Sequence, residues 1–303
     1  MRTLATASLA VLTLIFTACS SGSPAIITLS GPLSGNWQIN LLQQYPTQTP
    51  LSASGFISQA KAALTGSIQV APVGSKSSCG GVSALTGTVS GQSVTFSLND
   101  GGTVVNYTGT LSSDSQTMSG DYQAVGGACF SAGTSGTWNA VLIPALNGNF
   151  TGTLSGSTYM SALTGQSDAP PIAVSGSFSQ SSNANGSNAT LTGTITAVGY
   201  PCFTTASLTG TISGQNVYLD VFGYNGAQIG TLGIPGVPSE GATSTPATLI
   251  SSSTGLSLVG SGEGGLALGQ GLAGPCPAIF INGASTTGDV TNVALTFKSP
   301  TAN

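Results

Sequence analysis

The sequence LTGTVSGQ at residues 85–92 recurs as LTGTISGQ at residues 208–215, with one exchange of Val for Ile. The two stretches are 123 positions apart, and Cys79 and Cys202 are separated by the same number of positions. Self-similarity at a fixed spacing is typical of a duplicated structural unit and is sought before a fold is assigned. Because a chain rich in Gly and Thr produces chance matches, the flanking segments decide whether this match is a true repeat.

Four further pairs of similar segments surround this match in the same order. They are GNWQI (35–39) and GNFTG (148–152), SGFISQ (54–59) and SGSFSQ (175–180), ALTGSI (63–68) and TLTGTI (190–195), and TWNAVL (137–142) and TNVALT (291–296). The preserved order indicates a tandem duplication, with one unit over 31–144 and a second over 145–303. The second unit is longer, and we expect its additional residues to form an enlarged loop region near 223–272.

Apolar and polar residues alternate within both units. Every second residue is apolar in VTFSL (94–98) and in VYLDV (217–221), which is the pattern of a half-buried strand. Turn sequences such as SGQS and NDGG recur at intervals of about 8–12 residues, a spacing typical of sandwiches and barrels. We therefore predict an all-β protein with two tandem antiparallel meander barrels or barrel-like units, and a pair of β-sandwiches is the alternative.

The composition excludes several classes of function. Only 4% of the residues are charged, against roughly 25% in an average globular protein. Nucleic-acid binding requires clustered Lys and Arg that neutralise phosphates, and this chain has four such residues in all. It also has no histidine, which removes the usual general base and most zinc and haem sites. We therefore expect no nucleic-acid partner, no metal, no cofactor and no catalytic residues, and hence a protein that is not an enzyme.

The first 18 residues have the composition of an export signal. Arg2 precedes an apolar stretch over 4–16, which is shorter than the about 20 residues of a transmembrane helix and fits the apolar core of a signal peptide. At its end, Phe16-Thr17-Ala18-Cys19 resembles the lipobox of bacterial membrane lipoproteins.

The lipobox resemblance implies a location and an anchor. It implies removal of residues 1–18, lipidation of Cys19 and attachment to a membrane through acyl chains, with 19–30 as a flexible tether. Ser20 directly after the cysteine resembles the signal that permits sorting to the outer membrane. We expect an exported protein anchored at the outer membrane and facing the periplasm or the cell exterior.

The remaining cysteines are expected to form two disulfides. If Cys19 is lipidated, four cysteines remain, an even number that is typical of disulfides in an exported chain. Four cysteines allow three pairings, and the repeat selects one of them, because each unit has one cysteine before its LTGT strand and another near its end. The expected bridges are Cys79–Cys129 and Cys202–Cys276.

The first expected strand carries a second resemblance. Gly35-Asn36-Trp37 has the G-x-W pattern and resembles the opening of lipocalins and related calycins, which implies a barrel that carries a small apolar ligand. An eight-stranded barrel has room for one such ligand, but side chains can fill it equally well. The candidate ligand-lining residues are Phe96, Tyr107, Tyr122, Phe178, Tyr218 and Phe222.

Two functions remain open from the sequence. The first is a non-enzymatic, lipid-anchored envelope protein with a structural or binding role, whose partner is another envelope protein or a small ligand. The second is a lipocalin-like carrier.

Overall fold

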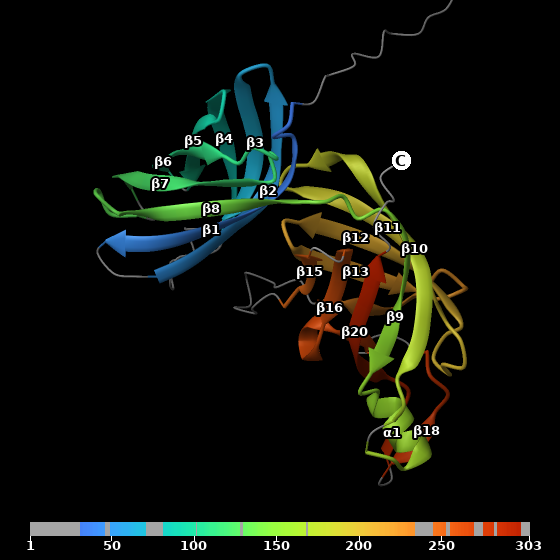
Figure 1. The fold of residues 1–303 in the computed structure, drawn as a ribbon. Coiled ribbons are helices and arrows are strands. Elements are labelled where there is room, and N and C mark those ends of the chain that lie inside the picture. The colour runs from blue at the N-terminus through green and yellow to red at the C-terminus, as the bar shows by residue number, and fades with distance from the viewer. Residues whose placement is uncertain are drawn as a thin grey trace, which may run out of the picture.

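The chain folds into two closed antiparallel β-barrels (Figure 1). The computed structural model describes residues 31–45, 49–70, 81–100, 102–127, 130–167, 169–233, 245–252, 255–269, 275–281 and 284–297. Within these ranges it has one α-helix, α1 (Thr158–Thr164), and one short 3-10 helix, η2 (Gly262–Gly264). The predicted all-β fold with two barrels is confirmed, and the alternative of two sandwiches is wrong because both sheets close into rings.

Barrel 1 is an up-and-down meander. Each strand pairs with the next, and β8 returns to pair with β1. The strands are β1 (Gly35–Tyr45), β2 (Thr49–Ala60), β3 (Ala63–Val70), β4 (Gly81–Ser90), β5 (Ser93–Asp100), β6 (Thr103–Leu111), β7 (Thr117–Gly126) and β8 (Ser135–Ile143). Closure leaves none of these strands at an open edge, where unpaired backbone groups would invite association with other chains.

Barrel 2 follows the same order over its first five strands and closes onto β9 through its last strand. These strands are β9 (Gly148–Ser155), β10 (Ile172–Asn185), β11 (Asn188–Ala197), β12 (Thr205–Ser213), β13 (Asn216–Phe222) and β20 (Asp289–Phe297). Two pairs of short strands fill the wall between β13 and β20 at different levels: β15 (Ala247–Ser252) with β16 (Gly255–Gly260), and β14 (Gln228–Leu232) with β17 (Leu266–Leu268). A separate hairpin consists of β18 (Ile279–Ile281) and β19 (Ala284–Thr286).

The segment near 223–272 therefore differs from the enlarged loop region that we expected. Its described residues contain the four strands β14 to β17. The first residues of β13 pair with β15, whereas its later residues pair with β14. β20 is shared in the same way between β17 and β16. The additional residues are needed because two pairs of strands, one at each level, connect β13 to β20 in this part of the wall.

The recurrent Thr-Gly-Thr sequence places glycine on the inner face of the barrels. In β4 the leucine and glycine of LTGT alternate with threonines that are exposed on the outer face. A Cβ atom at Gly87 would lie 2.5 Å from Cβ of Phe96, and one at Gly109 would lie 2.7 Å from Cζ2 of Trp138. Real Cβ atoms do not approach so closely, so the inward glycines provide the space that the aromatic side chains occupy.

The matching sequence segments lie on equivalent strands. LTGT lies on β4 and on β12, each the fourth strand of its barrel. The cross-strand registers also agree, because Trp37 faces Gly55 and Phe150 faces Gly176. The predicted boundary after residue 144 lies in the connection between β8 and β9.

The last strands match with a different register from the one that the sequence suggested. Leu142 lies beside Trp37, and Phe297 lies beside the equivalent Phe150. Residues 137–142 therefore correspond to 292–297, one position later than in our match to 291–296. A shift of one residue exchanges the two faces of a strand. The match to 291–296 would therefore make the buried Trp138 equivalent to Asn292, which is exposed on the outer face.

A buried leucine closes one end of each barrel. Leu33 and Leu146 precede the first strand of their units, and both are completely buried. The backbone N–H of Leu33 donates to Oε1 of Gln59 (3.1 Å), and that of Leu146 donates to Oε1 of Gln180 (2.9 Å). The N–H of each glutamine donates back to the side chain that follows the leucine (2.9 Å and 2.7 Å). The duplicated glutamine thus fixes the same closing segment in both barrels.

The two barrels meet where the β12–β13 turn lies against the outer face of β1 and β2. The side-chain amide of Asn36 donates to the carbonyl of Gly214 (2.9 Å), and the N–H of Gly214 donates to Oδ1 of Asn36 (2.6 Å). The hydroxyls of Ser54 and Ser213 lie 2.9 Å apart. These four residues are buried, so the hydrogen bonds are shielded from water and fix the turn in one position.

Further contacts surround these hydrogen bonds. The N–H of Gln215 donates to Oε1 of Gln38 (3.2 Å). Phe56 and Val141, from the outer wall of barrel 1, pack against the apolar core of barrel 2, and Ile143 is part of that core. We call this contact between the 213–215 turn and the outer face of β1, β2 and β8 the inter-barrel joint.

We predict that Gly214→Ala weakens the inter-barrel joint. An added Cβ would lie 2.3 Å from Oε1 of Gln38 and 2.5 Å from Cβ of Ser54. Crowding of this kind lowers the free energy of unfolding by about 1–3 kcal/mol, and urea unfolding measures the loss.

Gly91→Ala is the matched control. Gly91 occupies the equivalent turn with φ of 58°, against 55° for Gly214, so both alanines incur the same left-handed backbone strain of about 1–2 kcal/mol. No atom lies within 4 Å of an added Cβ at Gly91. Equal losses in the two variants would contradict a stabilising joint.

Candidate functional site

Aromatic side chains pack against one another inside barrel 1. The predicted lining residues Phe96, Tyr107 and Tyr122 are all buried on the inner face. The rings of Phe96 and Tyr107 stack with centroids 4.6 Å apart, and Trp138 meets both of them edge-on at 5.2 Å and 5.8 Å. The interior around these residues is therefore filled by side chains.

The hydroxyl of Tyr122 is an exception to this dense packing. It is buried and has no hydrogen-bond partner among the described residues. Burial raises the pKa of this phenol, so the hydroxyl keeps its proton. An orphaned polar atom is costly in an apolar interior, and among the described residues of barrel 1 this hydroxyl is the one buried side-chain N or O atom without a partner.

Barrel 2 contains one of its three predicted lining residues. Phe178 is buried and packs against Phe150 and Phe297, with ring centroids 5.2 Å and 6.0 Å away. Tyr218 and Phe222 instead lie on the outer face of β13, because they alternate with the buried apolar residues of that strand. They do not line the barrel interior.

Trp37, which carries the resemblance to lipocalins, packs at the closed end of barrel 1. It is completely buried, and its Nε1 donates to the carbonyl of Leu33 (2.9 Å). The indole thus helps to hold the closing leucine, and Phe150 takes its place in barrel 2.

One of the two expected disulfides lies among the described residues. Cys202 and Cys276 are bonded, which confirms that pairing. The bridge joins the β11–β12 connection to the segment before β18. Cys79 and Cys129, like the lipidation candidate Cys19, lie outside the described residues.

Helix α1 lies at the end of barrel 2 that is remote from barrel 1 (Figure 1), and a buried carboxylate organises this end. Asp289, the first residue of β20, is 2% exposed. Its Oδ1 accepts from the hydroxyl of Thr158 and the N–H of Tyr159, both at 2.9 Å. Its Oδ2 accepts from Ser157 Oγ (2.6 Å) and the hydroxyl of Tyr200 (2.5 Å). Four donors thus compensate the loss of water around the buried carboxylate.

This cluster attaches α1 to the barrel. Ser157 caps α1 by accepting from the N–H of Met160 (2.9 Å) while it donates to Asp289. The hydroxyl of Tyr159 donates to the carbonyl of Pro277 (2.7 Å), next to the disulfide. Burial and the negative charge of Asp289 raise the pKa of Tyr200, so this phenol is a proton donor to the carboxylate. The sequence did not point to Asp289, although an acidic residue at an inward position of an alternating strand is a signal that could have identified it.

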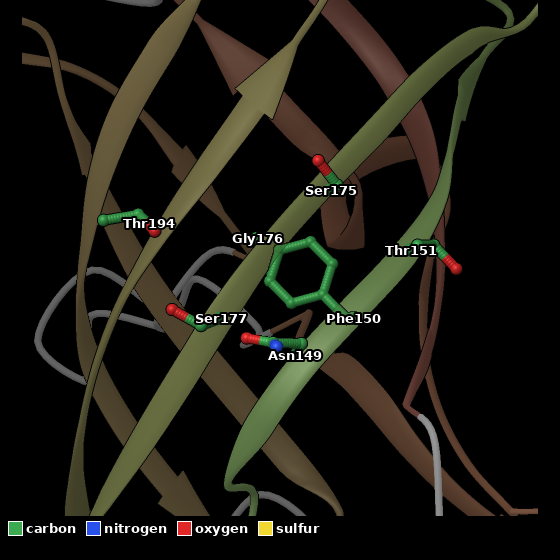
Figure 2. Close-up of a pocket in the computed structure, with 7 residues that line it drawn as sticks. All are labelled: Asn149, Phe150, Thr151, Ser175, Gly176, Ser177 and Thr194. Atoms are coloured by element: carbon green, nitrogen blue, oxygen red, sulfur yellow. The ribbon is translucent and has the colours of Figure 1, made fainter.

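A hollow of about 460 Å³ lies on the outer wall of barrel 2 (Figure 2). Its floor is Gly176, which is covered from the inside by the ring of Phe150, since a Cβ at this glycine would lie 2.6 Å from Cζ of that ring. Five polar side chains surround the floor: Asn149, Thr151, Ser175, Ser177 and Thr194. They come from β9, β10 and β11, and none of them is charged. The hollow can therefore bind a neutral polar group through hydrogen bonds, and no pattern in the sequence pointed to it.

Neither a metal-binding cluster nor a membrane-spanning helix occurs among the described residues. The described residues contain no group of three or more His, Cys, Asp or Glu side chains that could hold a metal ion. In the same part of the chain, no helix has the length and apolar character needed to cross a membrane. In comparisons with known proteins, no family model, no curated protein and no solved structure matches this chain.

We predict that Asp289→Asn destabilises barrel 2. The amide nitrogen of asparagine cannot accept a hydrogen bond, so at least one of the donors now directed at the carboxylate would be left buried without a partner. We expect a loss of about 2–4 kcal/mol in the free energy of unfolding, because hydrogen bonds to charged groups contribute about 1.5–3 kcal/mol each. Chemical denaturation followed by far-UV circular dichroism measures it.

Asp220→Asn is the control for this prediction. Asp220 is exposed on β13 and accepts from Nε2 of Gln228 (2.7 Å), and exposed substitutions of this kind change stability by about 0.5 kcal/mol or less. A loss at Asp289 no larger than the loss at Asp220 would show that the buried cluster does not hold the end of the barrel.

Proposed function

We propose that this protein is a non-enzymatic, lipid-anchored protein of the cell envelope, in which two rigid barrels present their outer faces to partners. The observation that carries the proposal is the packing of both interiors, where aromatic rings lie in contact around inward glycines. The closing leucines at one end, and the Asp289 cluster at the other end of barrel 2, support the same proposal. A filled barrel serves as a scaffold, and binding then takes place on its surface.

The anchoring part of the proposal depends on the sequence Phe16-Thr17-Ala18-Cys19. The N–H of Gly31 donates to the carbonyl of Gln59 (3.3 Å), so the chain is attached to barrel 1 from residue 31 onward. Residues 19–30 would then link the lipid to the barrel, and a segment of this length spans about 40 Å when fully extended. The barrels could thus stand clear of the membrane surface.

We predict that Cys19→Ser abolishes lipidation. Intact-mass analysis of the wild-type chain should give a mature protein without residues 1–18 and with added acyl mass, and cells fed labelled palmitate should incorporate the label. The Cys19→Ser chain should retain residues 1–18 and carry no label, because the thiol is the attachment point.

A double variant, Cys202→Ser with Cys276→Ser, is the control. It removes the disulfide of barrel 2 and should keep the palmitate label unchanged. A wild-type chain with the unmodified mass of all 303 residues would refute the anchoring proposal.

A second candidate function is a carrier of a small ligand inside barrel 1. The unpartnered hydroxyl of Tyr122 favours it, because a ligand with a polar group would satisfy this buried donor. Barrel 1 would then have to open its aromatic packing around Phe96 and Tyr107 to admit the ligand.

The variant Tyr122→Phe distinguishes the two candidates. If barrel 1 is only packed, we expect no bound small molecule in native mass spectrometry and no uptake of a fluorescent fatty acid. The variant should then be as stable as the wild type or up to about 1 kcal/mol more stable, because it removes an unsatisfied polar atom. Uptake of the probe by the wild type, with at least fivefold weaker uptake by the variant, would instead support the carrier.

A further inference from the structure

The inter-barrel joint uses a turn whose duplicate is exposed. The turn Ser213-Gly214-Gln215 between β12 and β13 is buried in the joint, except for the half-buried Gln215. The turn Ser90-Gly91-Gln92 between β4 and β5 has the same sequence, and all three of its residues are exposed.

The two turns have the same backbone conformation. Their glycines have φ of 55° and 58°. The carbonyl of each glutamine accepts a backbone N–H from a strand farther along the chain at 2.8 Å, that of Leu249 for Gln215 and that of Leu111 for Gln92. The exposed turn therefore presents its serine hydroxyl and glycine backbone as the docked turn does.

The surface that receives the docked turn is also duplicated. On barrel 1 it contains Asn36 and Gln38 of β1 and Ser54 of β2, where Gln38 pairs with Ser54 and the neighbouring Trp37 pairs with Gly55. On barrel 2 the same register pairs Thr151 with Ser175 and Phe150 with Gly176. The equivalent of Asn36 is Asn149, as the repeated Gly-Asn sequence also indicates.

This duplicate surface is the hollow shown in Figure 2. Asn149, Thr151 and Ser175 line it at the positions of Asn36, Gln38 and Ser54. No part of the described chain occupies it in the way that the 213–215 turn occupies the surface of barrel 1.

We propose that this protein associates head to tail, with the Ser90–Gln92 turn of one copy docked in the outer hollow of barrel 2 of the next. The amide of Asn149 pairs with the N–H and carbonyl of Gly91, and the hydroxyl of Ser175 meets that of Ser90. These are the contacts that Asn36 and Ser54 make within the chain. The proposal does not depend on the anchoring of Cys19.

The joint between copies is weaker than the joint within the chain. Thr151 replaces Gln38 and is too short to reproduce its contact with the turn, and Ser177 stands at the position of Phe56, which packs against barrel 2 in the inter-barrel joint. Both surfaces are uncharged, so the association should vary little with ionic strength.

The geometry also determines the form of the assembly. Each copy presents the exposed Ser90–Gln92 turn on barrel 1 and the hollow on barrel 2. A contact between the turn of one copy and the hollow of another joins different surfaces of two identical molecules. Contacts of this kind produce open chains, or rings where the rotation closes. A copy that lacks either element can only end a chain.

Two variants test the proposal. Gly91→Asn adds a side chain to the exposed turn, at the position where Gly214 of the docked turn has no room for a Cβ atom. Asparagine tolerates the left-handed conformation that this position requires. Asn149→Ala removes the amide from the hollow, and because Asn149 is exposed we expect the fold to be unchanged. Full chains are purified in the same mild detergent, so that association through the N-terminal segment is common to all of them.

Sedimentation velocity over a range of protein concentrations should show dimers and longer species for the wild type. Each variant alone should associate at least tenfold more weakly. An equimolar mixture of the two should form dimers and nothing longer, because the intact turn of the Asn149→Ala chain fits the intact hollow of the Gly91→Asn chain.

Thr192→Ala is the control, since Thr192 is exposed on β11 outside the hollow, and it should associate as the wild type does. Three results would overturn the proposal: a wild-type chain that stays monomeric at every concentration, variants that associate as strongly as the wild type, or a mixture that forms no dimers. Thermal unfolding of each variant verifies that a loss of association is not a loss of fold.

Discussion

Closure of the two sheets is the constraint on which the rest of this structure depends. A chain with 4% charged residues has few lysines and acids with which to protect an exposed strand edge, and an unprotected edge is a site of aggregation. Both units avoid the problem because every strand of the rings has two neighbours. Barrel 2 shows how strict the requirement is. Where its wall divides between β13 and β20, the pair β15–β16 and the pair β14–β17 each complete the ring at their own level.

Closure in turn determines what fills the interior. The inner faces carry glycines and large aromatic residues in complementary positions, so that Trp138 lies over Gly109 and Tyr122 lies over Gly136. The indole Nε1 of Trp138 donates to the carbonyls of Thr108 and Asp121, both at 3.1 Å, which satisfies its polar atom as a buried tryptophan requires. With the interiors occupied in this way, the polar outer walls are the surface that remains for contacts with other molecules, and our proposed function depends on it.

Local sequence patterns predicted the features that depend on neighbouring residues. Alternation and turn spacing were sufficient to predict antiparallel strands in a barrel or a sandwich, and the structure decided for closed barrels. The order of the repeated segments was sufficient to predict that β4 and β12 are equivalent. The alternation in VYLDV also contains the outward position of Tyr218, but the expectation that aromatic residues face inward outweighed it. The strands β14 and β17 have only five and three residues, which is too few for a period of two to be recognised among glycines.

The features that the sequence did not reveal join residues that are far apart in the chain. Asp289 meets Ser157 across 132 positions, and Asn36 meets Gly214 across 178 positions. No local period relates such partners, and each of them has an ordinary appearance in its own strand or turn. The repeat was the single long-range signal in the sequence, and it predicted the Cys202–Cys276 bridge because it compares positions that only the fold brings together.

The duplication also explains why the molecule is asymmetric. In a symmetric pair of units, the turn of each unit would dock on the surface of the other, so that each contact would occur twice. Here the second turn docks on the first unit, while Ser90, Gly91 and Gln92 stay exposed. The two units are therefore joined head to tail, and a head-to-tail pair always leaves one turn and one surface unused. Thr151 and Ser177, which stand at the positions of Gln38 and Phe56, lie on this second surface, where no turn of the same chain restricts the side chains. Both units carry the same residue at two of these positions, Asn149 and Ser175, whose counterparts Asn36 and Ser54 contact the docked turn directly through hydrogen bonds.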